Sequence, residues 1–371
     1  MKKAVPMFAL LVMLTALGWG QTPTPAPHSP SAAPSYTITA VGDPSPWFDR
    51  NMATAISANG IVAGAAFIRD NATPFVYQNG NLRFLTPLGV CCENTPGGVN
   101  SSGQVITTNV NWGPETSYQA ILYTGGQPFD IPLPDSRGFG INDSGCIVGS
   151  VGSGLMPPLS PAWTAFLYCN GAVHYLPSLA TCASTGTSEG FATAINPTGQ
   201  IVGASSTANC GSHAFLYKNG RIKDLGTLGG DYSIANAIST NGLITGASST
   251  AASSFRRAFL YKGNKMMALG TLPGCTDISG NGVNKHGIVV GGCWKSQAEW
   301  PYNYAAVIYD GKNLFDLNAL IPGNSGWRLL WATAINDDGE IIGEGIHGEP
   351  GSPGYDMGFL LTPVTRPAIP H

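Results

Sequence analysis

Charged side chains are scarce in this sequence: they account for 11% of its 371 residues, and the formal net charge is −3. The 18 basic residues are scattered along the chain and form no basic stripe. Because phosphate neutralisation requires clustered Lys and Arg side chains, the sequence predicts no nucleic-acid partner. No long apolar run follows the N-terminal segment, which predicts no membrane-spanning segment in the mature chain.

Sequence motifs of the common catalytic sites are also missing. The chain contains no G-x-S-x-G elbow, no H-E-x-x-H pair and no phosphate-binding loop. Its six His residues are scattered, and Cys91-Cys92 has no C-x-x-C partner, so neither a metal site nor a cofactor is expected. His213 precedes a predicted strand, and we interpret it as structural. The sequence therefore predicts that the protein is not an enzyme.

The N-terminus has the pattern of a secretory signal peptide. Lys2 and Lys3 precede an apolar stretch over residues 4–17, and small residues follow at the cleavage-determining positions. We therefore expect residues 1–20 to be removed and the protein to be exported, either to the periplasm or out of the cell. An uncleaved anchor helix is the alternative, which the shortness of the apolar stretch disfavours.

Glycine is abundant, with 49 residues spread along the chain, which implies many tight turns between short strands. Self-comparison shows that one module recurs seven times. The module starts with a short apolar strand, a polar turn ending in Gly and a second strand, as in residues 194–203, AINPTGQIVG. A third strand follows, such as HAFLY ending at Tyr217, and then a fourth, such as residues 221–226. The turn glycines that mark the modules are Gly60, Gly103, Gly145, Gly199, Gly242, Gly287 and Gly339.

Four short strands in about 45 residues are typical of a propeller blade. We therefore expect an all-β fold, with residues 36–363 forming a single seven-bladed β-propeller of four-stranded blades, between a Pro/Ser/Ala-rich linker (21–35) and a C-terminal tail (364–371). The seventh module ends after its third strand, whereas residues 36–42 resemble a fourth strand. This N-terminal strand is expected to complete the last blade and close the ring, which would remove an open sheet edge and leave a monomer. An open solenoid and a two-sheet sandwich are the alternatives.

The fourth module carries HAFLY over residues 213–217 and DLGTLGG over residues 224–230. Together with the preceding AINPTGQIVG, this pattern resembles the bacterial extracellular HAF repeat, and the resemblance covers nearly all of residues 36–363. Other modules depart from the pattern, since the fifth has Arg257 in place of the His and the first has Pro74-Phe75. The resemblance implies an exported bacterial β-repeat protein, and it implies no defined activity and no catalytic residue.

Eight cysteines follow the predicted signal peptide, and an even number in an exported chain favours disulfides. The repeat register places six of them in pairs, on antiparallel neighbouring strands or on connections at the same end of a module. These pairs are Cys146 with Cys169, Cys182 with Cys210, and Cys275 with Cys293. Cys91 and Cys92 are left over, and a strained vicinal disulfide is one option for them.

Tryptophan provides candidates for a binding surface, because Trp combines a large apolar face with a polar N–H. By the repeat register, the seven tryptophans of the mature chain fall in the variable connections or at their edges: Trp47, Trp112, Trp163, Trp294, Trp300, Trp327 and Trp331. Asp231 and Tyr232 are further candidates on the same loop-rich face. Binding sites usually lie on such variable loops. The alternative is that the tryptophans only pack the loops against the sheet ends.

The sequence leaves three functional hypotheses. The first is a non-catalytic binding or scaffolding module that recognises a glycan or an extracellular protein on its loop-rich face. The second is an extracellular polysaccharide hydrolase or lyase, which would need two converging carboxylates. The third is a purely structural envelope protein. Fold alone does not separate them, because propellers host many unrelated activities.

Overall fold

The computed structural model describes residues 36–43, 48–69, 71–86, 92–111, 116–152, 163–296, 303–348 and 355–364, with the backbone alone for residues 92 and 93. Residues 34–371 belong to one unit, and within it the described regular structure consists of β-strands and one 3-10 turn, η1 (Leu317–Leu320). The predicted all-β class is therefore confirmed. None of the described segments is a helix long and apolar enough to span a membrane.

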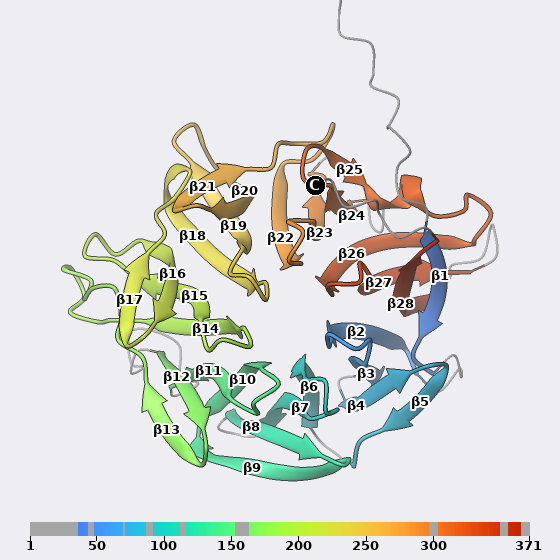
Figure 1. Ribbon diagram of the computed structural model, residues 1–371, viewed down its shortest axis with the longest axis horizontal. Helices are drawn as coiled ribbons and strands as arrows, with labels where there is room; N and C mark the ends of the chain where they lie inside the picture. The colour runs from blue at the N-terminus through green and yellow to red at the C-terminus, as the bar shows by residue number, and fades with distance from the viewer. Residues whose placement is uncertain are drawn as a thin grey trace, which may run out of the picture. The chain divides into compact units, whose positions relative to one another are not determined.

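Strands that are consecutive in the sequence pair antiparallel and form groups of four (Figure 1). The first strands of the groups lie toward a common centre: β2 (Arg50–Ile56), β6 (Cys92–Val99), β10 (Ser136–Ile141), β14 (Gly190–Ile195), β18 (Gly229–Ile238), β22 (Asp277–Val283) and β26 (Trp327–Ile335). The second strands are β3 (Val62–Ile68), β7 (Val105–Asn111), β11 (Ile147–Val151), β15 (Ile201–Ser206), β19 (Ile244–Thr250), β23 (Val289–Trp294) and β27 (Ile341–His347).

The third and fourth strands of the groups follow outward. The third strands are β4 (Asn71–Gln78), β8 (Ser117–Thr124), β12 (Thr164–Cys169), β16 (Ser212–Lys218), β20 (Ser253–Lys262), β24 (Tyr304–Tyr309) and β28 (Tyr355–Pro363). The outer strands are β5 (Asn81–Phe84), β9 (Gln127–Pro134), β13 (Ala172–Tyr175), β17 (Arg221–Asp224), β21 (Lys265–Ala268), β25 (Leu314–Asp316) and, from the other end of the chain, β1 (Tyr36–Val41). β1 pairs antiparallel with β28, from Tyr36 opposite Pro363 to Val41 opposite Gly358.

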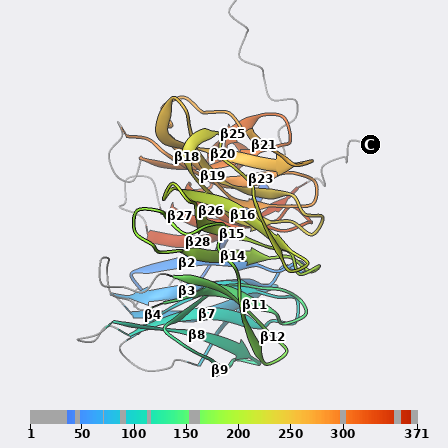
Figure 2. The same ribbon diagram turned by 90° about the vertical axis from the view of Figure 1, so that its left-hand side faces the viewer.

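The module sequence is explained by close packing between the second and third strands. In most groups a glycine of the second strand lies directly opposite a phenylalanine of the third, as Gly64 lies opposite Phe75 and Gly343 opposite Phe359. A Cβ atom at either glycine would overlap the phenylalanine ring, and both rings are fully buried. Phe75 also packs with Ile342 of the neighbouring group, and the sheets of successive groups lie face to face in side view (Figure 2).

Asparagine side chains in the tight turns connect the groups to one another, except that Asn336 of the last group donates within its own turn, to Glu340. Asn196 accepts hydrogen bonds through Oδ1 from the backbone N–H groups of Thr198 and Gln200. Its Nδ2 donates to the carbonyl oxygen of Ser239, in the corresponding turn of the following group, at 3.2 Å. The same bond to the next turn recurs from Asn100 to Asn142, from Asn142 to Asn196 and from Asn284 to Asn336.

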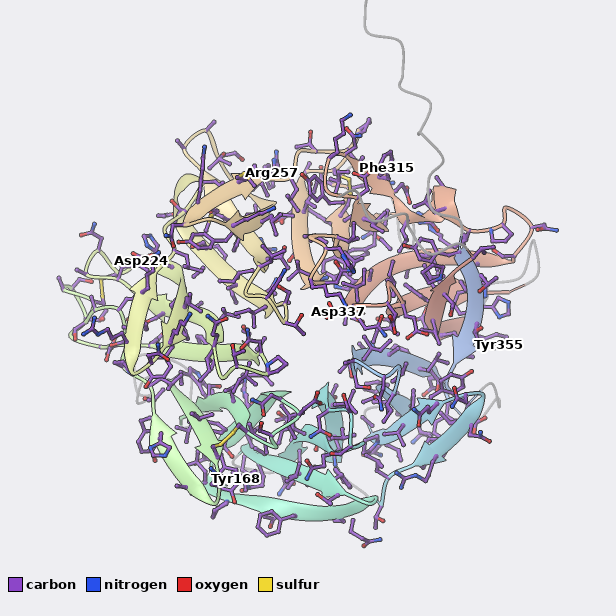
Figure 3. All side chains as sticks on the ribbon, viewed as in Figure 1. Tyr168, Asp224, Arg257, Phe315, Asp337 and Tyr355 are labelled. Atoms are coloured by element: carbon purple, nitrogen blue, oxygen red, sulfur yellow. A yellow bond between two sulfur atoms is a disulfide. The ribbon has the colours of Figure 1, made fainter. Side chains whose placement is uncertain are left out.

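Two turns achieve the same connection with a different pair of residues. Ser239 replaces the asparagine, and Asn241 two residues later donates through Nδ2 to the carbonyl oxygen of Lys285 at 2.8 Å. Ser57 and Asn59 repeat this arrangement toward Ser101. These turns lie toward the centre of the unit, where Figure 3 labels Asp337.

A second set of bonds starts from the β-bulges of four first strands. The pairing of β14 with β15 shifts between Ala192 and Ala194, which leaves Thr193 as the extra residue. The Thr193 hydroxyl donates to the carbonyl oxygen of Ala235 on the next first strand, at 2.7 Å. Equivalent donations run from Asn236 to Gly280, from Asn281 to Ala332 and from Thr333 to Ala53, at 2.9, 2.9 and 2.8 Å.

All three disulfides predicted from the repeat register are present. Cys146 bonds to Cys169, Cys182 to Cys210 and Cys275 to Cys293, with Cα–Cα distances of 4.4, 4.5 and 5.6 Å. Each joins cysteines that are 18 to 28 residues apart in the sequence. Such a cross-link lowers the entropy of the unfolded chain and so stabilises the folded protein by about 3 kcal/mol. The predicted options for Cys91 and Cys92 lie outside the described part of the chain.

The contribution of the turn asparagine to stability can be tested by replacing it with the Ser/Asn pair that another turn uses. Asn196→Ala leaves the buried carbonyl of Ser239 and two backbone N–H groups without their partner, so we expect the free energy of unfolding to fall by about 2 kcal/mol. The double substitution Asn196→Ser with Thr198→Asn reproduces the Ser239/Asn241 arrangement and is expected to restore most of the loss. Chemical denaturation of the three proteins measures this, and equal destabilisation of both variants would contradict it.

Candidate functional site

Four side chains from three successive groups form one stack, which we call the Arg137 cluster. The guanidinium carbon of Arg137, on β10, lies 3.8 Å from the ring centroid of Tyr118 and 4.3 Å from that of Trp163. Tyr118 belongs to β8, whereas Trp163 directly precedes β12. Trp163 also contacts Phe191 of β14, with 6.2 Å between the ring centroids. The guanidinium therefore makes cation–π contacts with two aromatic rings, whose centroids are 6.1 Å apart and whose planes are inclined at 71°.

The repeat register accounts for this clustering. Tyr118, Trp163 and Tyr304 occupy the same position, five residues before the last tyrosine of their module's third-strand motif. Each of these rings contacts a residue of the next first strand along the chain. The contacted residue lies two positions before the bulge residue of that same strand. The contact pairs are Tyr118 with Arg137, Trp163 with Phe191, and Tyr304 with Trp331. The same two positions of the module are therefore in contact in three modules, and each time an aromatic ring packs against the neighbouring first strand.

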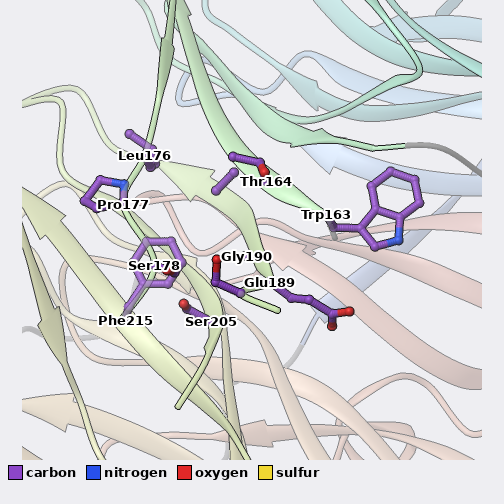
Figure 4. Close-up of a pocket in the computed structure, with 11 residues that line it drawn as sticks. Trp163, Thr164, Leu176, Pro177, Ser178, Glu189, Gly190, Ser205 and Phe215 are labelled. Atoms are coloured by element: carbon purple, nitrogen blue, oxygen red, sulfur yellow. The ribbon is translucent and has the colours of Figure 1, made fainter. Parts of the chain in front are cut away.

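A pocket opens beside Trp163, between the third and fourth groups (Figure 4). It holds about 300 Å³ of space, some of which is open to solvent. The residues that line it come from the start of β12, the connection from β13 to β14, and the strands β15 and β16: Trp163, Thr164, Ala165, Leu176, Pro177, Ser178, Ser188, Glu189, Gly190, Ser205 and Phe215. Variable connections therefore supply most of its wall, as expected for a binding site on a rigid scaffold.

Polar and apolar side chains are mixed along the pocket (Figure 4). Leu176 and Phe215 are buried, whereas the Glu189 side chain is exposed. Ser205 is engaged already, because its hydroxyl accepts a hydrogen bond from the backbone N–H of Leu179 at 2.9 Å. The hydroxyl of Ser178 and the Glu189 carboxylate make no hydrogen bond to other described residues, so both are available to a ligand. Trp163 and Glu189 lie toward the same end of the pocket (Figure 4).

The predicted tryptophans are not gathered in one place. Trp163 is the one that lines the pocket, while Trp294 ends β23 with 36% of its surface exposed. Trp327 stacks on His347, with 4.6 Å between the ring centroids. The remaining predicted residues Trp47, Trp112 and Trp300 lie outside the described residues.

One part of the tryptophan prediction is wrong. Trp331 lies in the interior of β26, opposite Glu344, and not in a connection or at its edge. The reason is that β26 begins at Trp327 and has nine residues, longer than the short first strand that the sequence indicated. Its ring packs against Tyr304, with 6.2 Å between the centroids, and covers Gly292. Trp331 therefore fills space between two groups.

Asp231 and Tyr232, the other predicted candidates, belong to β18 in the fifth group. Asp231 is exposed, and the backbone N–H of Tyr232 donates to the Ser249 hydroxyl at 3.1 Å. Neither residue lines the Trp163 pocket. The sequence reasoning missed Tyr118, Arg137 and Glu189, although alignment of the modules on their tyrosines would have drawn attention to Tyr118.

His213 pairs with an acidic residue that the repeat pattern also contains. Its Nδ1 lies 2.9 Å from Oδ2 of Asp224, and Asp224 also accepts a hydrogen bond from the backbone N–H of Gly226. The pair joins the third strand of the fourth group to its fourth strand, on the outer side of the unit where Figure 3 labels Asp224. This contact gives the His and the Asp of that module a structural role.

A second cluster of charge lies where the last strands of the chain meet the first group. Arg50 of β2 and Asp356 of β28 are partners in a parallel bridge, and Glu344 lies on the neighbouring β27. Burial raises the pKa of Glu344, and the nearby Asp356 raises it further, while Arg50 opposes the shift. Burial also raises the pKa of Asp356, again against Arg50. Two carboxylates thus share one guanidinium, which packs 4.2 Å from the Phe67 ring centroid.

Comparison with known proteins identifies the fold. No family model matches the chain, and no curated protein matches it. Among solved structures, the β-propeller domain of the Trilobed protease from Pyrococcus furiosus, for which an open velcro topology is described, superimposes with a TM-score of 0.56. That likeness covers 87% of this chain and 100% of the other, at 11% sequence identity. The fold of the described unit is therefore that of a β-propeller.

Two further structures match at lower similarity. TolB from Acinetobacter baumannii has a TM-score of 0.41 at 11% identity, over 74% of this chain and 64% of that one. An acylaminoacyl peptidase from Pyrococcus horikoshii has a TM-score of 0.47 at 10% identity, over 79% of this chain. The match spans about half of the peptidase, 48% of its length.

The raised pKa of Glu344 predicts how stability depends on pH. Between the unfolded-state pKa and the raised folded-state pKa, the folded protein binds more protons, so stability falls as the pH rises through this window. Glu344→Gln mimics the neutral form, so we expect it to be more stable than the wild type at neutral pH and to lose stability less steeply above about pH 4. Denaturation at several pH values measures both slopes.

The exposed residue Asp231 provides the matched control, since Asp231→Asn also removes one carboxylate. Its pH profile should follow that of the wild type. Identical slopes in Glu344→Gln and the wild type would contradict the assignment of a destabilising charge to this buried position.

Proposed function

We propose that this protein is an exported, non-catalytic binding module: a closed seven-bladed β-propeller, related to the HAF-repeat proteins, that binds a glycan in the pocket beside Trp163. The function is carried by one observation, the pocket of about 300 Å³ that combines an aromatic ring, free hydroxyls and an exposed carboxylate on the variable connections. An indole face and hydroxyl-bonding groups are the elements that a sugar ring uses.

Two contacts between the ends of the chain support the closed ring. β1 pairs with β28 over six residues, which adds a fourth strand to the last group. Thr333, in the last group, donates to the carbonyl oxygen of Ala53 in the first, although 280 residues separate them in the sequence. In a closed ring, neither the first nor the last blade leaves an unpaired surface that could associate with a second chain, so we propose a monomer.

Export is supported by the signal-like residues 1–20 and by the three disulfides, because such bonds persist in oxidising compartments. Binding is favoured over catalysis because Glu189 is the single carboxylate among the residues that line the pocket. Glycoside hydrolysis generally uses two carboxyl groups on either side of the bond that is cleaved. A glycan is favoured over a protein because the pocket places an indole beside hydroxyl-bonding groups, which suits a sugar ring.

Glycan-array and polysaccharide pull-down experiments on residues 21–371, followed by titration with intrinsic tryptophan fluorescence, test this function. We expect saturable binding with a fluorescence change, and Trp163→Ala should weaken it about 10-fold or more because the aromatic wall is lost. Trp327→Ala is the matched control, because Trp327 stacks on His347 and does not line the pocket.

The two variants separate the outcomes. Binding that survives in Trp327→Ala and is lost in Trp163→Ala would support the pocket. Absence of binding across the whole panel, or equal loss in both variants, would contradict the proposal and favour a protein partner or a structural role.

A further inference from the structure

Arg137 is a positioned cation without an anionic partner. It forms no ion pair and donates no hydrogen bond to any other described residue, and its Nε is buried. Two other arginines do have partners: Arg256 pairs with Asp277 at 3.1 Å, and Arg257 donates to the carbonyl oxygen of Thr276. A half-buried guanidinium has five donors, and leaving them unused is unfavourable.

The two flanking rings hold the guanidinium without using its donors. The ring centroids of Tyr118 and Trp163 lie 3.8 and 4.3 Å from the guanidinium carbon, and neither residue accepts a hydrogen bond from the guanidinium N–H groups. Stacking compensates part of the desolvation cost and limits the rotamers of the side chain. The remaining edge of the planar fork is suited to a carboxylate, which accepts two parallel hydrogen bonds from it.

Trp163 connects this cation to the pocket, because the same indole that stacks on Arg137 also lines the pocket wall. Arg137 does not itself line the pocket, so a ligand there would reach the guanidinium by extending past the Trp163 ring. Ser178 and Glu189 provide hydroxyl-bonding groups elsewhere in the pocket, as neutral parts of a sugar require. The segment before Trp163, residues 153–162, contains no acidic residue in its sequence that could neutralise Arg137.

We propose that the glycan bound beside Trp163 is acidic, and that Arg137 recognises the carboxylate of a hexuronic acid unit. This inference depends on the proposed function, since it specifies which class of sugar occupies the pocket. Arg137 acts here as a specificity-determining residue, and Trp163 provides the aromatic wall for the sugar ring. An acidic peptide offers the same carboxylate chemistry, but a peptide has no ring of hydroxyls to match Ser178 and Glu189.

Paired ligands test the proposal. Oligogalacturonate, oligomannuronate and oligoguluronate are titrated into residues 21–371, each beside the same oligosaccharide after carboxyl reduction. We expect at least one acid to bind about 10- to 100-fold more tightly than its reduced form, which corresponds to one charge-assisted bidentate contact. The preference should decrease at high salt, because screening weakens attraction at a partly exposed site.

Variants assign the preference to one residue. Arg137→Gln is expected to bind the acid and its reduced form equally, and Arg137→Lys, which keeps the charge but loses the planar fork, should retain only part of the preference. Arg256→Gln removes a cation that already has a partner, so it is the control and should leave the preference unchanged. Thermal unfolding of each variant verifies that the fold is intact.

Each alternative result has a distinct meaning. Equal binding of acid and reduced forms by the wild type would overturn the role of Arg137 and leave glycan binding at Trp163 in place. Absence of binding to either form would overturn both proposals. Binding of an acidic peptide instead, lost in Arg137→Gln, would overturn the sugar assignment.

Discussion

Side-chain donors that reach from one strand group to a backbone carbonyl of the next are the contacts on which the rest of this structure depends. A four-stranded sheet of this size cannot bury both faces by itself, so each group needs its neighbours. Apolar stacking between sheets is not directional, and alone it would permit neighbouring groups to slide. The bonds from Asn196 to Ser239 and from Thr193 to Ala235 fix the relative position of two groups at the turn and at the bulge.

The candidate site shows why this relative position matters. Tyr118, Arg137 and Phe191 come from three different groups, and Trp163 lies between them. None of these groups contains the cluster by itself, so its geometry is set by how the groups are held against one another. The charge at Arg137 contacts aromatic rings, whereas Arg50 only partly offsets the cost of burying the Glu344 carboxylate at the junction between the last and first groups.

Repetition made much of the fold predictable from the sequence. The strands, the glycine turns and the pairing of Cys146 with Cys169 all follow from module register, because positions that recur in the sequence recur in the sheet. The recurring turn asparagines are visible in the sequence, but their reach is not: the side-chain donors of Asn142, Asn196 and Asn284 bond to the next group. Such contacts between groups have no signature within one module.

The candidate site was predictable only in part for the same reason. Trp163 was identified because of its residue type, whereas Arg137 and Glu189 acquire their interest from neighbours that lie far away in the sequence. Trp331 has the same residue type as Trp163, yet it packs between groups because β26 extends further than the pattern indicated. Residue type alone does not separate a tryptophan that lines the pocket from one that packs between groups, because the difference lies in what each side chain contacts.

Closure of the ring between β1 and β28 is the central claim, and cross-linking tests it most directly. Thr37 and Thr362 are exposed and lie opposite each other in the pairing of these strands, where the Thr37 hydroxyl donates to the carbonyl oxygen of Thr362. In the double variant Thr37→Cys with Thr362→Cys, the account predicts a disulfide within one chain, identified by peptide mass mapping of the monomer. Cross-links found only in dimers, or none between these two cysteines, would contradict it.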